Sequence, residues 1–399
     1  MIRLHHKQLN QSISVGRIIG HLQGNQKGPC IIFTGGIHGN EPSGVFALNR
    51  VIELFKDKQD LFRGSVYALS GNLKALQEGK RYISQDLNRL WTNSRVAEIE
   101  RKHLKEKDAE TEEMLDLYYT FAAIREREEG PFYFMDLHTT SSESCPFLTV
   151  NDSLLNRKFT AQYPAPVILG LEEFLDGPVL SFVNEQGFVA FGFEGGQHDS
   201  EEALDNHIAF CVLSMVYTGI IDPESIDITP YYDQLDQTLG PPHLFYEINS
   251  RYAIKEDEAF SMKPGFLNFQ RVNKGEVLAE SNGLLVRAER DFRIFMPLYQ
   301  PQGHDGFFGI KPIPRLFLRL SIILRRVRID RLLSLLPGVR WADERKTALI
   351  VNRRIARFFT RDIFHLMGYR SRQLTKNHLI MKNREARARR DEYKDAPWY

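Results

Sequence analysis

The chain of 399 residues contains little cysteine and no long apolar run. Its three cysteines, Cys30, Cys145 and Cys211, are an odd number at wide spacings, which excludes a disulfide framework and a zinc-ribbon pattern. No apolar segment is long enough to span a bilayer, and the opening residues MIRLHHKQLN lack the apolar core of a secretory signal. We therefore expect a globular protein of the cytoplasm, the compartment where it is made.

Net charge is nearly absent as well, at +1, but the charges are unevenly distributed. Residues 311–399 hold 23 of the 52 Lys and Arg residues and only 8 of the 51 Asp and Glu residues. This segment therefore carries a net charge of about +15, and the rest of the chain about −14. Such asymmetry indicates an appended segment with a partner of its own.

From residue 30 onward, short apolar runs alternate with stretches of helical periodicity. The runs at 30–36, 65–72, 132–138, 165–170 and 188–196 are typical of buried strands, and 43–57 and 201–220 are typical of helices. This alternation predicts an α/β fold with a mostly parallel mixed sheet flanked by helices. We expect a catalytic domain at residues 1–228.

The second half of the chain has a different character. From about residue 241, short β-rich runs are separated by Gly, Pro and Asn, which predicts a small β-rich domain at residues 229–310. Residues 311–399 are rich in arginine and helical in pattern, beginning with RLFLRLSIILRRVRIDRLLSLL. We expect a basic, helical C-terminal extension.

His38 and Glu41 follow the first predicted core strand, in the stretch TGGIHGNEPSG. The carboxyl ends of parallel strands are where open α/β sheets place their sites. A histidine and a carboxylate three residues apart can bind one metal ion, although this spacing alone also describes the polar tip of a βα turn.

A second predicted strand ends in Asp136 and His138, within FYFMDLHTTSS. Residues two apart lie on the same side of a strand. His138 completes a candidate His₂Glu site with an open position for water, the ligand set of a catalytic zinc, and Asp136 is a candidate to support a ligand from behind. The alternative is a hydrogen-bonded histidine at a strand end.

Glu194 ends a third predicted strand and is flanked by glycines, in FGFEGGQH. A carboxylate in an apolar setting has a raised pKa, which suits a group that takes a proton from water and returns it to a leaving group. The alternatives are a carboxylate at a helix N-terminus and a surface turn.

The segment KRYISQDLNRLW reads as an irregular loop that contains Arg81, Asp86, Asn88 and Arg89. Arginine forks bind carboxylates, and an arginine beside a metal can stabilise an oxyanion. We expect Asp86 to hold the loop rather than to contact substrate. For either arginine, a surface salt bridge is the alternative.

Four motifs, GGIHGNE, RYISQDLNR, DLHTT and GFEGG, occur in this order and resemble the succinylglutamate desuccinylase and aspartoacylase family of zinc carboxypeptidase-like hydrolases. The resemblance covers residues 30 to about 310. It implies one Zn²⁺ per chain bound by three ligands, His38, Glu41 and His138. It also implies metal-assisted hydrolysis of the amide bond of an N-acyl amino acid or a related carboxylate-bearing amide.

The resemblance further implies Glu194 as general base and acid and Arg81 as the residue that polarises the carbonyl. Asn88 and Arg89 would then bind the α-carboxylate of the substrate. One departure concerns specificity: aspartoacylases carry a tyrosine and an arginine fourteen and ten residues before the catalytic glutamate, where this chain has Leu180 and Asn184. Because a buried unpaired carboxylate is costly, N-acetylaspartate is disfavoured as substrate.

Two other functions are compatible with the sequence. One is a deacylase or amidase acting on a larger or lipid-like acyl compound, and the other is a non-catalytic metal-binding scaffold of the same fold. For the basic extension we expect docking on the acidic body, with an anionic membrane surface or a protein partner as alternatives. Nucleic acid is disfavoured because no reading motif is present. The sequence leaves oligomerisation open.

Overall fold

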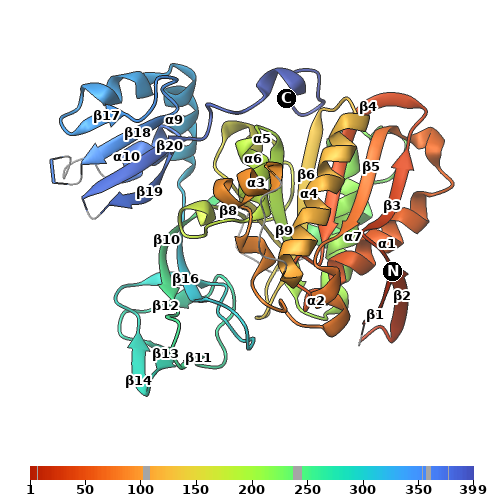
Figure 1. The fold of residues 1–399 in the computed structure, drawn as a ribbon, viewed down its shortest axis with the longest axis horizontal. Coiled ribbons are helices and arrows are strands. Elements are labelled where there is room, and N and C mark those ends of the chain that lie inside the picture. The colour runs from red at the N-terminus through yellow and green to blue at the C-terminus, as the bar shows by residue number, and fades with distance from the viewer. Residues whose placement is uncertain (7, 102–107, 237–244, 353, 356–360, 376) are drawn as a thin grey trace.

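The structure is a computed structural model that describes the chain except for residues 7, 102–107, 237–244, 353, 356–360 and 376 (Figure 1). Its centre is an eleven-stranded sheet in the order β12-β15-β16-β10-β8-β7-β9-β6-β4-β5-β3. These strands are β3 (Ile18–Gln23), β4 (Gln26–Gly35), β5 (Arg63–Ser70), β6 (Phe132–Thr140), β7 (Phe147–Val150), β8 (Val167–Leu169), β9 (Val189–Gln197), β10 (Phe245–Ala253), β12 (Arg271–Val272), β15 (Phe292–Phe295) and β16 (Asp305–Pro312).

The part of the sheet nearest the N-terminus is mainly parallel. β5, β4, β6 and β9 run parallel to one another, whereas β3 and β7 join them antiparallel. The residues of β4 from Cys30 to Gly35 are all buried, as expected for a strand covered on both faces. The predicted large mixed sheet with flanking helices is confirmed, and a two-stranded hairpin of β1 (Ile2–His6) and β2 (Gln11–Val15) precedes it.

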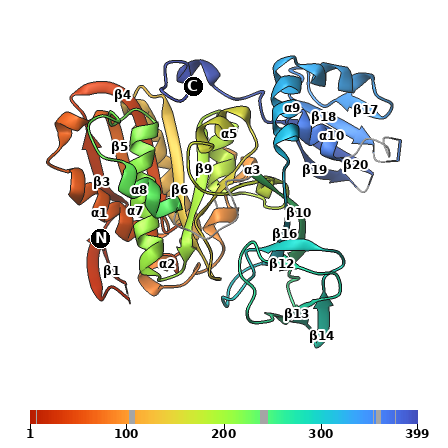
Figure 2. The same cartoon turned by 180° about the vertical axis from the view of Figure 1, so that it is seen from behind.

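Helices cover both faces of this sheet. α1 and α7 pack together on one face, where Leu48, Val51 and Phe210 join the larger buried cluster. α4 covers the other face, seen in front of the sheet in Figure 1, and α7 is in front in Figure 2. The helices of this part are α1 (Ser43–Phe55), α2 (Leu73–Glu78), α3 (Asn93–Glu100), α4 (Ala109–Arg127), α5 (Leu154–Thr160), α6 (Val179–Glu185), α7 (Glu201–Tyr217) and α8 (Thr229–Asp236).

The segment from β10 to β16 is rich in strands and extends the central sheet. β10 pairs with β8 in parallel and with β16 antiparallel, so the two halves of the chain share one sheet. A separate three-stranded sheet contains β11 (Phe260–Met262), β13 (Val277–Ser281) and β14 (Leu284–Arg287). The predicted onset of the β-rich segment near residue 241 lies outside the described residues, and the three domain boundaries stay predictions.

The predicted helical extension at 311–399 is wrong for much of its length. Four antiparallel strands form a sheet there in the order β17-β18-β20-β19: β17 (Val339–Trp341), β18 (Ala348–Asn352), β19 (Tyr369–Thr375) and β20 (His378–Asn383). In β18, Leu349 and Val351 are buried while Ile350 and Asn352 are only half-buried, a period of two that a strand requires. The abundance of arginine, a good helix former, obscured this period.

The helical elements of this C-terminal region are short. They are α9 (Arg315–Arg326), α10 (Arg361–Leu366) and the 3₁₀ segments η4 (Ile329–Leu335) and η5 (Arg390–Tyr393). Of the helices in the described part of the chain, none combines the length and the apolar character needed to cross a membrane.

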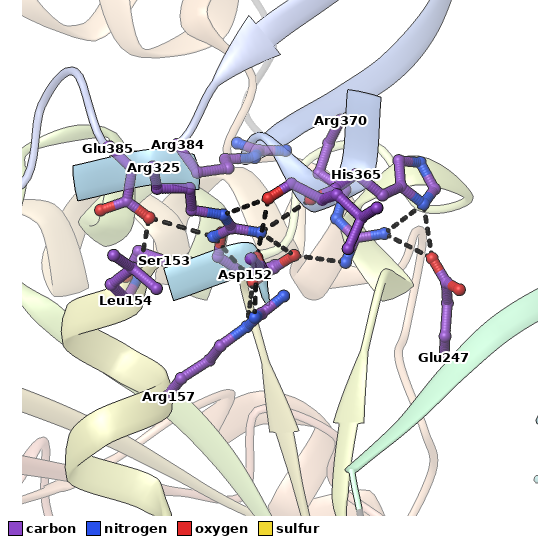
Figure 3. A network of polar contacts seen from close by, with 12 residues as sticks. Asp152, Ser153, Leu154, Arg157, Glu247, Arg325, His365, Arg370, Arg384 and Glu385 are labelled. Atoms are coloured by element: carbon purple, nitrogen blue, oxygen red, sulfur yellow. Dashed lines mark hydrogen bonds and ion pairs between the residues drawn. The ribbon is translucent and has the colours of Figure 1, made fainter. Parts of the chain in front are cut away.

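A buried network of ion pairs joins the C-terminal region, residues 311–399, to the α/β part of the chain that precedes it (Figure 3). Asp152 accepts hydrogen bonds from Arg325 of α9 at 3.0 Å and from Arg370 of β19 at 2.5 Å, and it also lies 2.5 Å from Arg157. At the chain end, Trp398 Nε1 donates to the hydroxyl of Tyr133 in β6. The C-terminal region is thus fixed at two separate places.

Candidate active site

A small cavity of about 90 Å³ lies at the carboxyl ends of β4, β6 and β9, where the sequence predicted a site. Six predicted site residues line it: His38, Glu41, Arg81, Arg89, His138 and Glu194. The structure therefore brings together residues from four segments that are far apart in the sequence.

Tight backbone packing shapes the turn that carries His38 and Glu41. Gly36 has a φ of +73°, a conformation that other residues rarely adopt. A Cβ on Gly39 would lie 2.1 Å from the backbone carbon of Ala75, so no other residue fits there. These glycines let the turn fold back against α2 and direct both side chains into the cavity.

His38, Glu41 and His138 form a compact set of potential metal ligands. One ligand atom from each lies within 4.8 Å of the other two. His38 Nδ1 is 2.8 Å from Glu41 Oε1, and His138 Nδ1 is 3.0 Å from Glu41 Oε2. Although burial opposes ionisation, the two histidines hold the pKa of Glu41 well below its usual range. A carboxylate between two imidazoles is a donor set that suits a divalent cation such as zinc.

Each histidine is supported from behind by a carboxylate. His138 Nε2 lies 2.8 Å from Asp136 Oδ2, and His38 Nε2 lies 3.3 Å from Asp86 Oδ1. Asp136 is held in turn by the hydroxyl of Thr34 at 2.5 Å. A carboxylate on the far nitrogen fixes the ring and directs the other nitrogen toward a metal. The residues present therefore fit a divalent cation such as zinc.

Glu194 lies beside this set at the end of β9. Burial raises the pKa of its carboxyl group to about 8; the charge of His138 opposes this rise, and Glu41 and Asp136 add to it. Its Oε2 has no hydrogen-bond partner among the described residues. A buried carboxylate that titrates near neutral pH is suited to accept and return a proton.

The loop that carries Arg81 is held by a single carboxylate of α4. Glu110 accepts hydrogen bonds from the backbone N–H groups of Ile83 at 2.7 Å, Ser84 at 2.9 Å and Gln85 at 3.2 Å. Arg81 Nη2 lies 2.8 Å from His38 Nε2 and 3.3 Å from Asp86 Oδ2. Arg81 is therefore placed beside the candidate ligands, and Asp86 holds both the arginine and the loop.

Arg89 and Asn88 occupy different environments. Arg89 lines the cavity and lies 3.5 Å from Asp305, which also pairs with Arg251 of β10. Asn88 is buried behind it, where its Oδ1 accepts a hydrogen bond from Val179 N at the start of α6. Asn88 is not among the residues that line the cavity, so its contact with substrate stays a prediction.

The β-rich segment supplies one wall of the cavity, which the sequence did not assign. Asp305, His304 and Gln300 line this wall, and Gln302 accepts a hydrogen bond from Arg81 N at 3.1 Å. The polar cluster QPQGHD, between two apolar strands, was the available signal. Tyr299 is not part of the lining; its hydroxyl donates to Lys263 O.

Another part of the cavity lining is apolar and comes from η3 (Leu171–Glu173), β16 and the loops beside them. The residues are Leu171, Leu175, Met296, Leu298 and Phe308. Leu180 and Asn184, the positions compared with aspartoacylases, are not among the lining residues. Asn184 instead accepts a hydrogen bond from Asn156 at 2.7 Å within the body of the protein.

The fold and the cavity define a mixed α/β protein with a candidate metal centre at its strand ends. Residues 27–186 match the succinylglutamate desuccinylase/aspartoacylase catalytic domain. This part of the chain is therefore similar to that family, and relatives named succinylglutamate desuccinylase support the similarity. The matched residues include all three candidate ligands but end before Glu194.

Several relatives are named succinylglutamate desuccinylase. The protein from Pseudomonas syringae is 24% identical over 305 residues, covering 73% of this chain and 85% of that protein. The Photorhabdus laumondii protein is 24% identical over 147 residues, 37% of this chain and only 43% of that protein. The crystal structure from Vibrio cholerae is 15% identical, with a TM-score of 0.55 over 78% of this chain and 91% of that one. At this identity, the structural likeness shows the fold alone.

Proposed function

We propose that this protein is a zinc-dependent hydrolase of the amide bond of an N-acyl amino acid or a related carboxylate-bearing amide. The observation that carries the proposal is the position of Glu194, whose pKa is raised to about 8, in the same cavity as a His₂Glu ligand set. The names of its relatives support deacylation as the reaction class.

His38, Glu41 and His138 would hold the zinc ion. When bound there, it supplies a Lewis acid that activates water and the substrate carbonyl. Glu194 accepts a proton from the attacking water and returns it to the amide nitrogen as the C–N bond breaks and the C–O bond forms. The products are a carboxylic acid and a free amine.

Arg81 and Arg89 would have separate roles. Arg81 is beside the ligands and donates to the carbonyl oxygen as negative charge grows on it. Arg89 lines the cavity and binds the carboxylate of the substrate, with Asn88 directly behind it. Since Asp305 already neutralises part of this charge, we expect a substrate with a single carboxylate near Arg89.

The apolar lining favours a second candidate, a deacylase for a larger or lipid-like acyl group. Leu171, Leu175 and Phe308 offer an acyl chain apolar contacts and offer a second carboxylate no partner. A panel with one amino acid and N-acetyl, N-succinyl, N-butyryl and N-octanoyl groups separates the candidates. The highest kcat/KM for N-succinyl would favour the dicarboxylate substrate, and the highest for N-octanoyl the lipid-like one.

The test begins with the metal content of the purified chain, measured by mass spectrometry for the wild type, His38→Ala and Glu194→Gln. We expect about one zinc per chain in the wild type and in Glu194→Gln, and little in His38→Ala. A folded wild type that takes up no metal when zinc is supplied would contradict the proposal. Bound zinc without turnover of any amide would favour a non-catalytic scaffold.

A further inference from the structure

Helix α9 buries two polar residues and exposes several apolar ones. Ser321 and Arg325 are buried, and Arg325 reaches Asp152 of the catalytic part. In contrast, Leu316 is 72% exposed and Ile323 is 58% exposed. A surface helix normally directs its apolar stripe to the core. Packing within the described residues therefore does not account for this exposed apolar face.

The exposed apolar residues form one continuous stripe. Leu316, Leu320, Ile323 and Val327 follow one another at spacings of four, three and four, so they share one face of the helix. All four are exposed, and beyond the helix the exposed residues Leu332 and Leu335 of η4 follow. Contiguous exposed apolar patches on soluble proteins commonly mark interaction sites.

Arginines accompany this stripe. Arg315, Arg319 and Arg326, spaced by four and seven, form a row beside it, and all three are exposed. Within the described part of the chain, no carboxylate forms an ion pair with any of the three. Exposed arginines without acidic neighbours favour an anionic partner.

The apolar stripe and the row of arginines together indicate which kind of partner binds this face. A second copy of the chain would bring arginine rows of like charge together. A nucleic acid would use the arginines but gain little from four exposed aliphatic side chains. A lipid surface uses both, since anionic headgroups attract arginines and the acyl boundary takes up the apolar stripe.

We propose that the α9 surface docks on an anionic lipid bilayer, with the helix lying in the plane of the headgroups. The α9 surface is defined as Arg315, Leu316, Arg319, Leu320, Ile323, Arg326 and Val327. Because Arg325 locks the opposite side of α9 to Asp152, the helix is held against the catalytic part when its outer face binds lipid (Figure 3). The docking is peripheral and independent of the proposed hydrolysis.

The test is flotation of the full-length protein with vesicles of phosphatidylcholine alone and with about a third phosphatidylglycerol. We expect binding only to the anionic vesicles, weakened by salt. The variant Arg315→Gln/Arg319→Gln/Arg326→Gln should lower the partition coefficient by about tenfold or more, since each arginine near an anionic surface contributes substantially. The variant Leu316→Glu/Ile323→Glu should abolish binding.

The chain offers a matched control in β14, where Leu284 and Leu285 are also exposed and Arg287 is nearby. The variant Leu284→Glu/Leu285→Glu should bind vesicles like the wild type, and circular dichroism should show that all variants fold. Equal loss in the control, or no binding to anionic vesicles by the wild type, would overturn the proposal. So would a dimer that Leu316→Glu/Ile323→Glu converts to a monomer, or binding of a DNA duplex that exceeds binding of the vesicles.

Discussion

Folding shifts the pKa values of two groups of buried carboxylates in opposite directions. In the buried ion network of Figure 3, the three arginines around Asp152 outweigh the effect of burial and hold its pKa well below the usual range. Glu247 of the same network behaves alike: burial alone would raise its pKa, but His365 and Arg370 lower it to about 2. In the cavity, burial raises the pKa of Glu194 to about 8.

The pKa values differ because Asp152 and Glu247 have cationic neighbours within hydrogen-bonding distance. Asp152 is 2.5 Å from Arg370 and 3.0 Å from Arg325, and Glu247 is 3.0 Å from Arg370. Among the described residues, Glu194 forms no ion pair and its Oε2 has no hydrogen bond, so the charges of His138 and Arg81 offset only part of the effect of burial on its pKa. A buried carboxylate without a partner is costly to keep. The network is therefore organised for stability, whereas the environment of Glu194 favours proton transfer.

The largest expected effect is on catalysis, in Glu194→Gln. Removal of the general base should lower kcat on the best N-acyl amino acid by about 10²–10⁴-fold. Because the substitution removes a buried group that is difficult to ionise, the melting temperature should stay constant or rise. Steady-state kinetics and thermal unfolding of the same preparation check both expectations.

Glu385→Gln is the matched control for this variant, since Glu385 belongs to the network and pairs with Arg325 at 3.1 Å. It should leave kcat unchanged and lower stability. If Glu194→Gln retained wild-type kcat, or lost stability like Glu385→Gln, the two groups of carboxylates would not differ in role.

The second largest expected effect is a loss of stability in the variant Asp152→Asn. The change leaves Arg157, Arg325 and Arg370 buried without their shared counter-ion. Breaking a buried pair in this way typically costs about 3–5 kcal/mol. We expect a lower urea midpoint, with the transition of the C-terminal region separating from that of the catalytic part.

Asp391→Asn provides the comparison, because Asp391 pairs with Lys394 only at the exposed surface. Its midpoint should equal that of the wild type. Equal midpoints for Asp152→Asn and the wild type would show that the network contributes nothing to the attachment of the C-terminal region.

The predictable parts of the molecule depend on local sequence. Each candidate ligand follows a short apolar run, and the predicted strands at 30–36 and 132–138 are observed as β4 and β6. Once parallel strands are assigned, their carboxyl ends meet at one edge, so the proximity of His38 and His138 followed from the strand assignments. The glycines around His38 were a further local signal, because they indicate a tight turn after β4.

The parts that escaped prediction depend on contacts distant in the sequence. Arg89 meets Asp305, 216 residues away, and Asp152 meets Arg370, 218 residues away. No local pattern announces such pairs. In the C-terminal region, an abundance of arginine around β18 hid the alternation of that strand, and the exposed stripe of α9 resembled an ordinary core-facing stripe. Pattern shows that a helix has two faces but not which face is buried.

The third prediction concerns pH and Glu247. Its pKa is lowered from the ordinary 4.5 to about 2, so its contribution to stability is present above about pH 4.5 and is lost as the pH falls toward 2. At pH 7, Glu247→Gln should cost about 3 kcal/mol of unfolding free energy. Urea unfolding of both proteins at decreasing pH should show the difference shrinking below pH 4.5. A difference that stays constant with pH would mean that the contribution of Glu247 is not electrostatic.

The smallest expected effect is on KM and concerns Glu173, which links the C-terminal region to the cavity. This residue lies in the 3₁₀ segment η3 (Leu171–Glu173), whose Leu171 lines the cavity. The C-terminal region holds Glu173 through Ser371 N at 3.0 Å and His365 Nε2 at 2.7 Å. Loosening η3 should change the fit of the substrate more than the chemistry.

We therefore expect Glu173→Gln to raise KM by about threefold to tenfold, or up to about 1.4 kcal/mol, with kcat nearly unchanged. Glu185→Gln is the control, because Glu185 also bridges to the C-terminal region, at 3.0 Å from Lys382, but does not belong to η3. Its KM should equal that of the wild type. Equal changes in both variants would assign the effect to general loosening of the interface. A change in Glu173→Gln alone would mean that the ion network also shapes the substrate cavity.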